Sequence, residues 1–202
     1  MSRIASREPT VIRLHSRLSV ADLLWVANTR HGPGGHWFAR PVRDLGDHDH
    51  LLEPAAAVEY LSTHGVPVPD ATPRPADLAG LRVIREMVRS LLRRRGGWTR
   101  DVREIVRAGR YRLTEDLALE PEETGWTGFL HDLVPPLLEV FARRDRLRVC
   151  GNPMCRLVFI DSSKNRSRRW CDTAGCGNRF RVRRHRRSVS RAPAAAAVHA
   201  PP

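Results

Sequence analysis

All four cysteines of this 202-residue chain lie within 27 residues, from Cys150 to Cys176. They form two pairs in the sequence, Cys150 with Cys155 and Cys171 with Cys176. Four residues separate the members of each pair, and 15 residues separate the two pairs. Each pair brackets a turn-forming sequence, GNPM or DTAG, which brings two sulfurs to one point. Four converging thiolates are a tetrahedral ligand set for one zinc ion and leave no open coordination position. The spacing therefore predicts one structural zinc ion rather than a catalytic one.

Other chemistries compete for these thiols. Two disulfides, four unrelated thiols and an iron–sulfur cluster, which also takes four thiolates, are the alternatives. The N-terminal sequence MSRIASREPT has no apolar segment typical of a secretory signal, so we expect a cytoplasmic protein. A reducing cytoplasm disfavours disulfides. Zinc is favoured because a basic module of about 40 residues buries too little apolar surface to fold alone, and zinc supplies about 10 kcal/mol or more.

The segments around the cysteines predict a small finger. Residues 157–160 form an apolar, β-branched run, SSKN at 162–165 predicts a turn, and residues 168–170 lead into the third cysteine as the second strand of a hairpin. Asn178 is placed to cap a helix that begins near Arg179. A cysteine-bracketed turn, called a zinc knuckle, followed by a hairpin and then a basic helix is typical of a treble-clef-like finger. A zinc ribbon is the alternative. We expect Trp170 to pack over the zinc knuckle with Phe159; stacking of Trp170 on a base is the alternative.

The excess positive charge of the chain lies in its C-terminal quarter. The net charge is +13, and residues 143–191 hold 16 Lys and Arg against three Asp, so the rest is neutral. Residues 179–191 carry seven arginines and no acid. A phosphate backbone is the natural counterpart of such a surface. The candidate nucleic-acid contacts are Arg166, Arg168, Arg169, Asn178, Arg179, Arg181, Arg183, Arg184, Arg186 and Arg187.

Several partners could carry the complementary charge. Nucleic acid is favoured over an anionic membrane surface, an acidic protein or a merely solubilising role. Phosphate contacts would supply affinity, and a few side chains at base edges would supply sequence preference. DNA is favoured over RNA, although small basic zinc modules also bind RNA.

The rest of the chain predicts a mainly α domain with one small β element. Apolar residues at helical spacing and terminal capping signals predict helices at 19–28, 52–64, 78–92, 99–108 and 128–144. Ser19 and Asp77 are the expected N-caps of the first and third helices, and Pro135 and Pro136 should kink or split the last one. A short strand is expected at 10–14 and a hairpin at 111–119.

Four segments follow from these patterns: a lead-in at 1–17, the helical domain at 18–144, the finger at 145–191 and a low-complexity tail at 192–202. No apolar run reaches the roughly 20 residues of a membrane span. The helical domain has no Ser–His–Asp arrangement with glycine turns, no phosphate-cradling loop and no HExxH, so we expect no enzymatic activity. His31, His36, His48 and His50 fit no ligand spacing and are expected to be solvated loop residues.

The finger resembles a known family. Cys176-Gly177-Asn178-Arg179 followed by RVRRHRR, with CGNPMC and SRRWC upstream, is similar to the bacterial CGNR zinc-finger proteins. Residues 22–29, DLLWVANT, and 81–92, LRVIREMVRSLL, resemble the helical ABATE domain that precedes the finger in that family. The resemblance implies zinc on the four cysteines and a stress-induced transcription regulator. A homodimer and a small-molecule ligand of the helical domain are compatible with that role.

Overall fold

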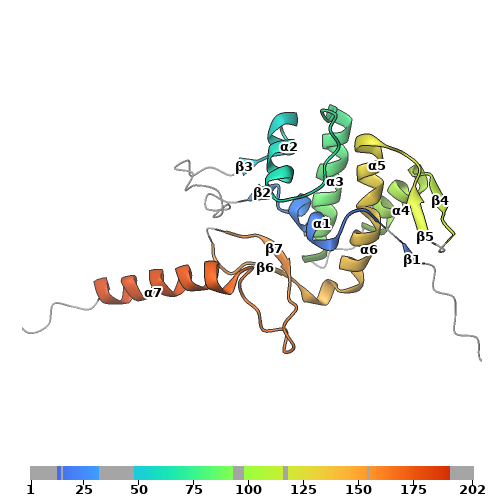
Figure 1. Cartoon of the computed structure of the whole chain (residues 1–202). Coiled ribbons are helices and arrows are strands. Elements are labelled where there is room, and N and C mark those ends of the chain that lie inside the picture. Colours follow the sequence, from blue (N-terminus) through green and yellow to red (C-terminus); the bar gives the residue numbers. More distant parts are fainter. Residues whose placement is uncertain are drawn as a thin grey trace, which may run out of the picture. The chain divides into compact units, whose positions relative to one another are not determined.

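The computed structural model describes residues 13–14, 16–31, 48–92, 98–115, 118–153 and 155–191 (Figure 1). These residues form two compact units. The first holds the described residues up to Arg30 and from Asp49 to Asp145, and the second consists mainly of the residues from Arg146 onward. The predicted tail and most of the predicted lead-in lie outside the described residues. The mainly α class with small β elements is confirmed.

The described residues of the first unit form six helices. They are α1 Val20–Ala27, α2 Pro54–Thr63, α3 Pro75–Leu92, α4 Trp98–Ala108, α5 Gly125–Asp132 and α6 Val134–Ala142. Its strands are β1 Arg13–Leu14, β4 Tyr111–Leu113 and β5 Ala118–Pro121. The chain also contains a separate two-stranded pair, β2 Arg30–His31 and β3 His48–Asp49. The short 3-10 turn η1, Arg144–Arg146, follows α6. None of the described helices combines the length and apolar character that crossing a bilayer requires.

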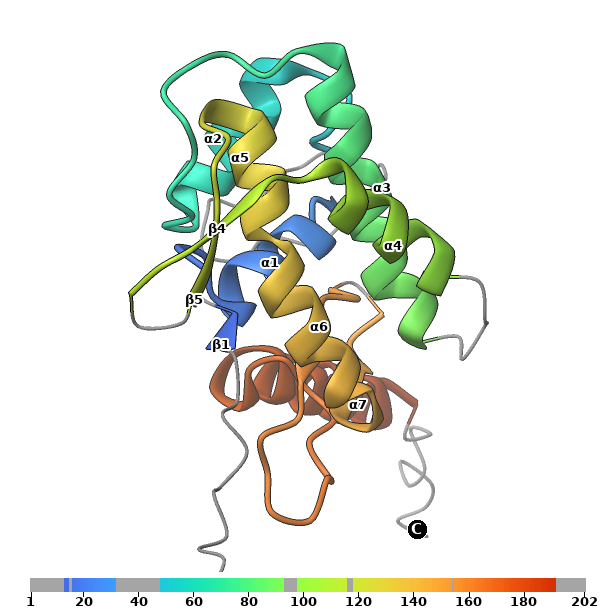
Figure 2. The same cartoon turned by 90° about the vertical axis from the view of Figure 1, so that its right-hand side faces the viewer.

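Helix α3 is the centre of this unit, and α1, α2, α4, α5 and α6 all pack against it (Figure 2). Apolar side chains recur along α3 at intervals of three or four residues, as the helical pattern predicted. Its buried apolar residues are Leu78, Leu81, Ile84, Met87, Val88 and Leu91. The core therefore forms around this one strongly amphipathic helix.

The β element and the proline split follow the prediction. Strands β4 and β5 form the expected antiparallel hairpin, and β1 adds to β5 in parallel register. Helix α5 ends at Asp132 and α6 begins at Val134, with proline in its first turn. Proline lacks the N–H that a continuous helix needs, so the chain restarts there instead of continuing.

One of the two predicted N-caps is correct. Ser19 caps α1, since its hydroxyl accepts from the Asp22 N–H and the Asp22 carboxylate accepts from the Ser19 N–H. Asp77 is not the cap of α3, because that helix begins at Pro75. The Asp77 carboxylate instead accepts from the N–H and guanidinium of Arg74. A first-turn acid that reaches back to the chain before the helix produces the same sequence signal as a cap.

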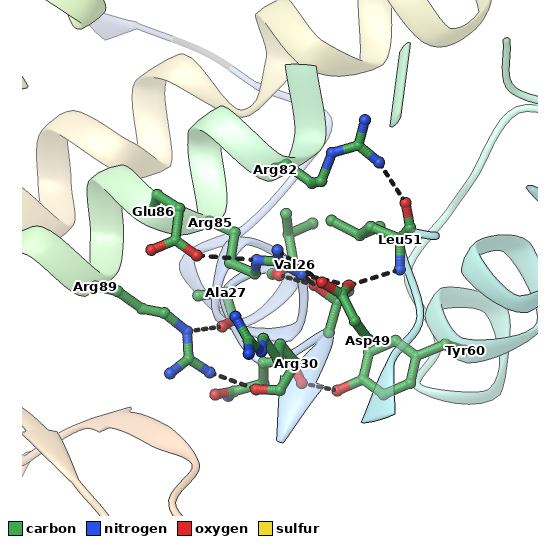
Figure 3. Close-up of polar contacts among 12 residues, drawn as sticks. Val26, Ala27, Arg30, Asp49, Leu51, Tyr60, Arg82, Arg85, Glu86 and Arg89 are labelled. Carbon is green, nitrogen blue, oxygen red and sulfur yellow. Dashed lines mark hydrogen bonds and ion pairs between the residues drawn. The ribbon is translucent and has the colours of Figure 1, made fainter. Parts of the chain in front are cut away.

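Arginines on α3 bind backbone carbonyls at the end of α1, in β2 and after β3 (Figure 3). Arg89 donates from Nε to the Ala27 carbonyl at 3.0 Å and from Nη2 to the Arg30 carbonyl. Arg82 donates to the Leu51 carbonyl at 2.6 Å. The last carbonyls of a helix have no intrahelical partner and carry partial negative charge, which favours cations there. These contacts tie α1 and the chain after β3 to the central helix.

Between these two arginines lies a buried ion pair. The Arg85 guanidinium donates to both carboxylate oxygens of Asp49, at 2.6 and 3.0 Å, and the two side chains are 4% and 17% exposed. Burial raises the pKa of Asp49, but hydrogen bonds from Arg85 and from the Leu51 N–H outweigh it, so that pKa lies below its ordinary value. The Asp49 carboxylate therefore stays charged at neutral pH.

We predict that Arg85→Met lowers the free energy of unfolding of this unit by about 3–5 kcal/mol, because it leaves the Asp49 carboxylate buried without its partner. The matched control is Arg100→Met, which removes an arginine that is 85% exposed and paired with Glu104. That change should cost less than about 1 kcal/mol. Urea unfolding followed by far-UV circular dichroism measures both, and equal losses would contradict the buried-pair assignment.

The second unit contains β6 Leu147–Val149, β7 Val158–Ile160, the π-helical turn η2 Thr173–Gly177 and α7 Asn178–Arg191. The predicted hairpin is wrong in the strand that pairs with residues 158–160. β7 pairs antiparallel with β6, so the hairpin encloses the first cysteine pair, and residues 168–170 form no strand. The predicted cap is also wrong, because Asn178 has helical φ and ψ of −63° and −47° and is the first residue of α7. The η2 turn supplies the helix start that a cap would otherwise provide.

Candidate metal centre

The four cysteine sulfurs converge on one point. All four Sγ atoms lie within 4.8 Å of one another, and Cys171 is 3.6 Å from Cys155 and 3.7 Å from Cys176. Four sulfurs bound to one zinc ion at about 2.3 Å stand about 3.8 Å apart at the edges of a tetrahedron. Disulfide sulfurs lie about 2.05 Å apart, and all four cysteines are free. The cluster therefore has the geometry of a single metal centre.

Crowding gives these thiols very unequal acidity. Hydrogen bonds from Cys155 and Cys171 lower the pKa of Cys150 to about 2. The hydrogen bond between Cys155 and Cys150 raises the pKa of Cys155. The hydrogen bond between Cys171 and Cys150 raises the pKa of Cys171 to about 12. Four thiolates cannot ionise together at this distance unless a cation shares their charge. The donor set fits a divalent metal ion held by Cys150, Cys155, Cys171 and Cys176.

A compact turn presents the first cysteine pair. The Cys150 N–H donates to the Leu157 carbonyl at 2.8 Å, which extends the β6–β7 hairpin by one bond. The Cys155 N–H donates to the Asn152 carbonyl at 2.9 Å and closes the turn. Asn152 is buried, and its side-chain Nδ2 points to Cys176 Sγ at 3.7 Å. The first turn therefore donates a hydrogen bond to a sulfur of the second pair.

We predict that Asn152→Ala lowers zinc affinity about 10- to 100-fold, because the Cys176 sulfur loses a donor that stabilises its thiolate form. Competition with a chromogenic chelator at neutral pH measures the affinity of the full chain. Asn165→Ala, at an exposed loop asparagine of the same unit, is the matched control. Equal affinities for the two variants would show that the Asn152 contact is unimportant.

The second cysteine pair is held by η2. The Asp172 carboxylate caps this turn by accepting from the Ala174 N–H at 3.0 Å, and the Asp172 carbonyl accepts from the Gly177 N–H. Cys171 precedes the turn and Cys176 lies inside it, one residue before Gly177. Helix α7 follows immediately, so the metal ligands fix where the basic helix begins.

Trp170 packs between the two cysteine turns. A Cβ on Gly177 would lie 3.0 Å from Trp170 Cδ1, and a Cβ on Gly151 would lie 3.2 Å from Trp170 Cζ3, so both positions suit glycine. The ring lies 4.7 Å from that of Phe180, measured between centroids. Trp170 therefore packs over the knuckles as predicted, but it stacks on Phe180, while the Phe159 ring lies below the Arg168 guanidinium. This stack connects both knuckles to α7.

Asp161 organises the loop that returns to the third cysteine. It is fully buried, and its Oδ1 accepts from the Ser163 N–H and hydroxyl while Oδ2 accepts from the Arg168 N–H. Its own N–H donates to the Arg146 carbonyl at 2.8 Å. The bonds to the carboxylate, led by the one from the Ser163 hydroxyl, lower the pKa of Asp161. Sequence reasoning missed Asp161 and Asn152, because an acid or amide in a loop carries no signal of burial.

The three predicted loop arginines have different surroundings. Arg168 is half-buried, and its guanidinium donates to the carbonyls of Trp170 and Cys171, so its side chain holds the approach to the third ligand. Arg169 is exposed, with its guanidinium 5.7 Å from the Trp170 ring centroid. Arg166 is also exposed and has a positive φ of 53°.

The other predicted contacts lie on α7. Among residues 178–186 every side chain except that of Phe180 is exposed. The exposed candidates are Asn178, Arg179, Arg181, Arg183, Arg184 and Arg186. The side chain of Arg187 lies outside the described residues. The structure therefore presents a basic helix anchored at its first turn by Phe180 and by the metal-binding turn.

The described side chains contain one cluster with metal-binding spacing, which is the four cysteines. His50 packs on the Tyr60 ring at 4.4 Å between centroids. His36 and the side chains of His31 and His48 lie outside the described residues.

Comparison with known proteins supports the finger. A family model described as CGNR zinc finger matches residues 146–188. These residues contain all four cysteines, the β6–β7 hairpin and most of α7. No curated protein matches the chain.

Proposed function

We propose that the chain is a zinc-dependent nucleic-acid-binding protein and that it acts as a bacterial transcription regulator. Its second unit would bind the nucleic acid, and its first unit would sense a signal or form a dimer. The observation that carries the proposal is that a four-cysteine centre is followed directly by a helix whose described arginine side chains are exposed. The rest of the chain is electrically neutral, so the attraction to phosphate is concentrated on one module.

Zinc is the metal that best fits the centre. The sulfur separations of 3.6 and 3.7 Å suit one tetrahedral ion. An iron–sulfur cluster places several atoms between its cysteine ligands and therefore needs a wider cage. The ion would fold the module, and no catalytic role is proposed for it because four thiolates complete its coordination.

The order of elements supports a treble-clef-like finger. The first knuckle lies at the end of the β6–β7 hairpin, and the second lies at the start of α7. This arrangement would place the charged helix directly on the metal site. The resemblance of residues 22–29 and 81–92 to the ABATE domain supports a regulatory role for the helical unit, in which a homodimer or a small ligand would control binding.

RNA binding by the same basic surface is the second candidate. Its support is the arginine-rich composition, which attracts either nucleic acid. DNA is favoured because α7 is a regular helix of 14 residues whose exposed side chains include no Phe, Tyr or Trp, while single-stranded RNA is read largely by stacking on aromatic rings.

Salt dependence of binding tests the proposal. The zinc-loaded full chain should bind duplex DNA with an affinity that falls steeply with salt, by a slope of about −0.9 per phosphate contact on logarithmic axes. Fluorescence anisotropy measures this slope, and competition with a structured RNA hairpin separates the two candidates. An affinity that is unchanged between low and moderate salt would contradict both.

A further inference from the structure

The non-arginine positions of α7 form a pattern of their own. Between Arg179 and Arg187 only Phe180, Val182 and His185 are not arginine. Phe180 is accounted for by its stack on Trp170. Val182 is 42% exposed, although a helix that served only solubility would favour a charged residue at this position. His185 is exposed as well.

Val182 and His185 lie on the same side of the helix as Asn178, and Phe180 lies on the other side. At about 100° per residue, Val182 and His185 lie about 200° and 140° around the helix from Phe180, and Asn178 lies at about 160°. All three therefore lie opposite the side that packs on the metal site. We define them, Asn178, Val182 and His185, as the uncharged stripe.

Arginines flank the uncharged stripe on both sides. On the same scale Arg181 lies at about 100°, and Arg186 and Arg179 lie at about 240° and 260° from Phe180. All three side chains are exposed. A helix in the major groove has this distribution, because its central line faces base edges while its two sides face the phosphate strands.

The dimensions of α7 fit duplex DNA. The helix has 14 residues and is therefore about 21 Å long. It packs mainly against η2 and runs away from the β6–β7 hairpin (Figure 1). A helix with side chains is about 10–12 Å wide, which suits the B-DNA major groove of about 12 Å, whereas the major groove of A-form RNA is too narrow to be read.

We propose that α7 enters the major groove of duplex DNA and that Asn178, Val182 and His185 read the base sequence there. This inference rests on the proposed function and adds the nucleic-acid class and the residues that determine specificity. An asparagine amide matches the donor and acceptor pair of adenine, the valine methyls contact the thymine methyl, and the imidazole donates to a purine N7. The flanking arginines hold the helix by phosphate contacts that carry no sequence information.

Selection from a pool of duplexes with a randomised centre tests the inference with the zinc-loaded full chain. The wild type should enrich one base pattern, with a preference of about tenfold or more at each contacted position. The triple variant Asn178→Ala, Val182→Ala and His185→Ala should lose that pattern. Its affinity for the unselected pool and its salt slope should stay within about twofold of the wild type, because alanine retains the helix and all arginines remain.

The control is Ser188→Ala, an exposed α7 position off the uncharged stripe, which should enrich the wild-type pattern. Salt-dependent duplex binding without any preference, or an unchanged pattern in the triple variant, would overturn the reading role while leaving the proposed function intact. An RNA hairpin that displaces the duplex would overturn the duplex assignment. Absence of all salt-dependent binding in the wild type would instead remove the proposed function itself.

Discussion

Removing zinc from the full chain under reducing conditions is expected to unfold residues 146–191 and leave the first unit folded. The second unit buries only Leu147, Leu157, Val158 and Phe159 as apolar side chains apart from its cysteines, among the described residues. Burial of each contributes about 1.5–3 kcal/mol, whereas ordering one residue costs about 1–2 kcal/mol. Zinc bound to thiolates supplies about 10–16 kcal/mol at neutral pH. We therefore expect bound zinc to be the main source of folding free energy in this unit.

Hydrogen exchange followed by mass spectrometry separates the two units in one sample. After chelation, amides of β6, β7 and α7 should exchange at close to the unfolded rate, while those of α3 keep their protection. Adding zinc back should restore protection in the wild type. Cys171→Ser should behave like the chelated protein and recover little, because one thiolate ligand is missing. Protected finger amides in a metal-free sample would show that the cysteines are not the main stabilising element.

The convergence of the four cysteines could be predicted because the information for it is local. Each cysteine pair closes its own turn within six residues, so composition and spacing alone indicate convergence. The same holds for α3, whose apolar period reports one buried face, and for Ser19, whose cap lies three residues from Asp22. Such features need no knowledge of distant segments.

Two of the wrong predictions, the partner strand of the hairpin and the ring partner of Trp170, concern contacts between distant segments. The apolar run before Asp161 forms a strand, but its partner is β6, upstream of the first cysteine pair. Nothing in the composition of residues 147–149 distinguishes them from a connecting segment. Trp170 is similar: the sequence offered Phe159 as a ring partner, and the π-helical turn instead brought Phe180 beneath it.

Charge alone also failed to separate structural from exposed arginines. Arg168 and Arg169 are adjacent and chemically equal in the sequence. The structure uses the Arg168 guanidinium to bind backbone carbonyls beside the third ligand and leaves Arg169 exposed. Substituting Arg168 therefore disturbs the metal site and cannot report on nucleic-acid contacts alone. The arginines of α7 are better probes, because those described are exposed.

Replacing Arg179, Arg183 and Arg186 together by glutamine is expected to weaken duplex binding about 10²-fold at physiological salt. The three lie on one side of α7, at i, i+4 and i+7, and are all exposed. Removing one arginine from a phosphate lowers the magnitude of the salt slope by about 0.9, so the slope of the triple variant should become shallower by about 2.7. Glutamine retains helix propensity and hydrogen-bonding capacity, so the change tests charge rather than folding.

The first unit offers a closely matched control. Arg100, Arg103 and Arg107 of α4 have nearly the same spacing and are likewise exposed. Their replacement by glutamine changes the net charge of the chain by the same amount without touching the finger. Anisotropy titrations over a salt series should give this control the wild-type slope and affinity. Equal weakening by both triples would mean that the chain binds through its total charge, and α7 would then be one part of a diffuse positive surface instead of the binding element.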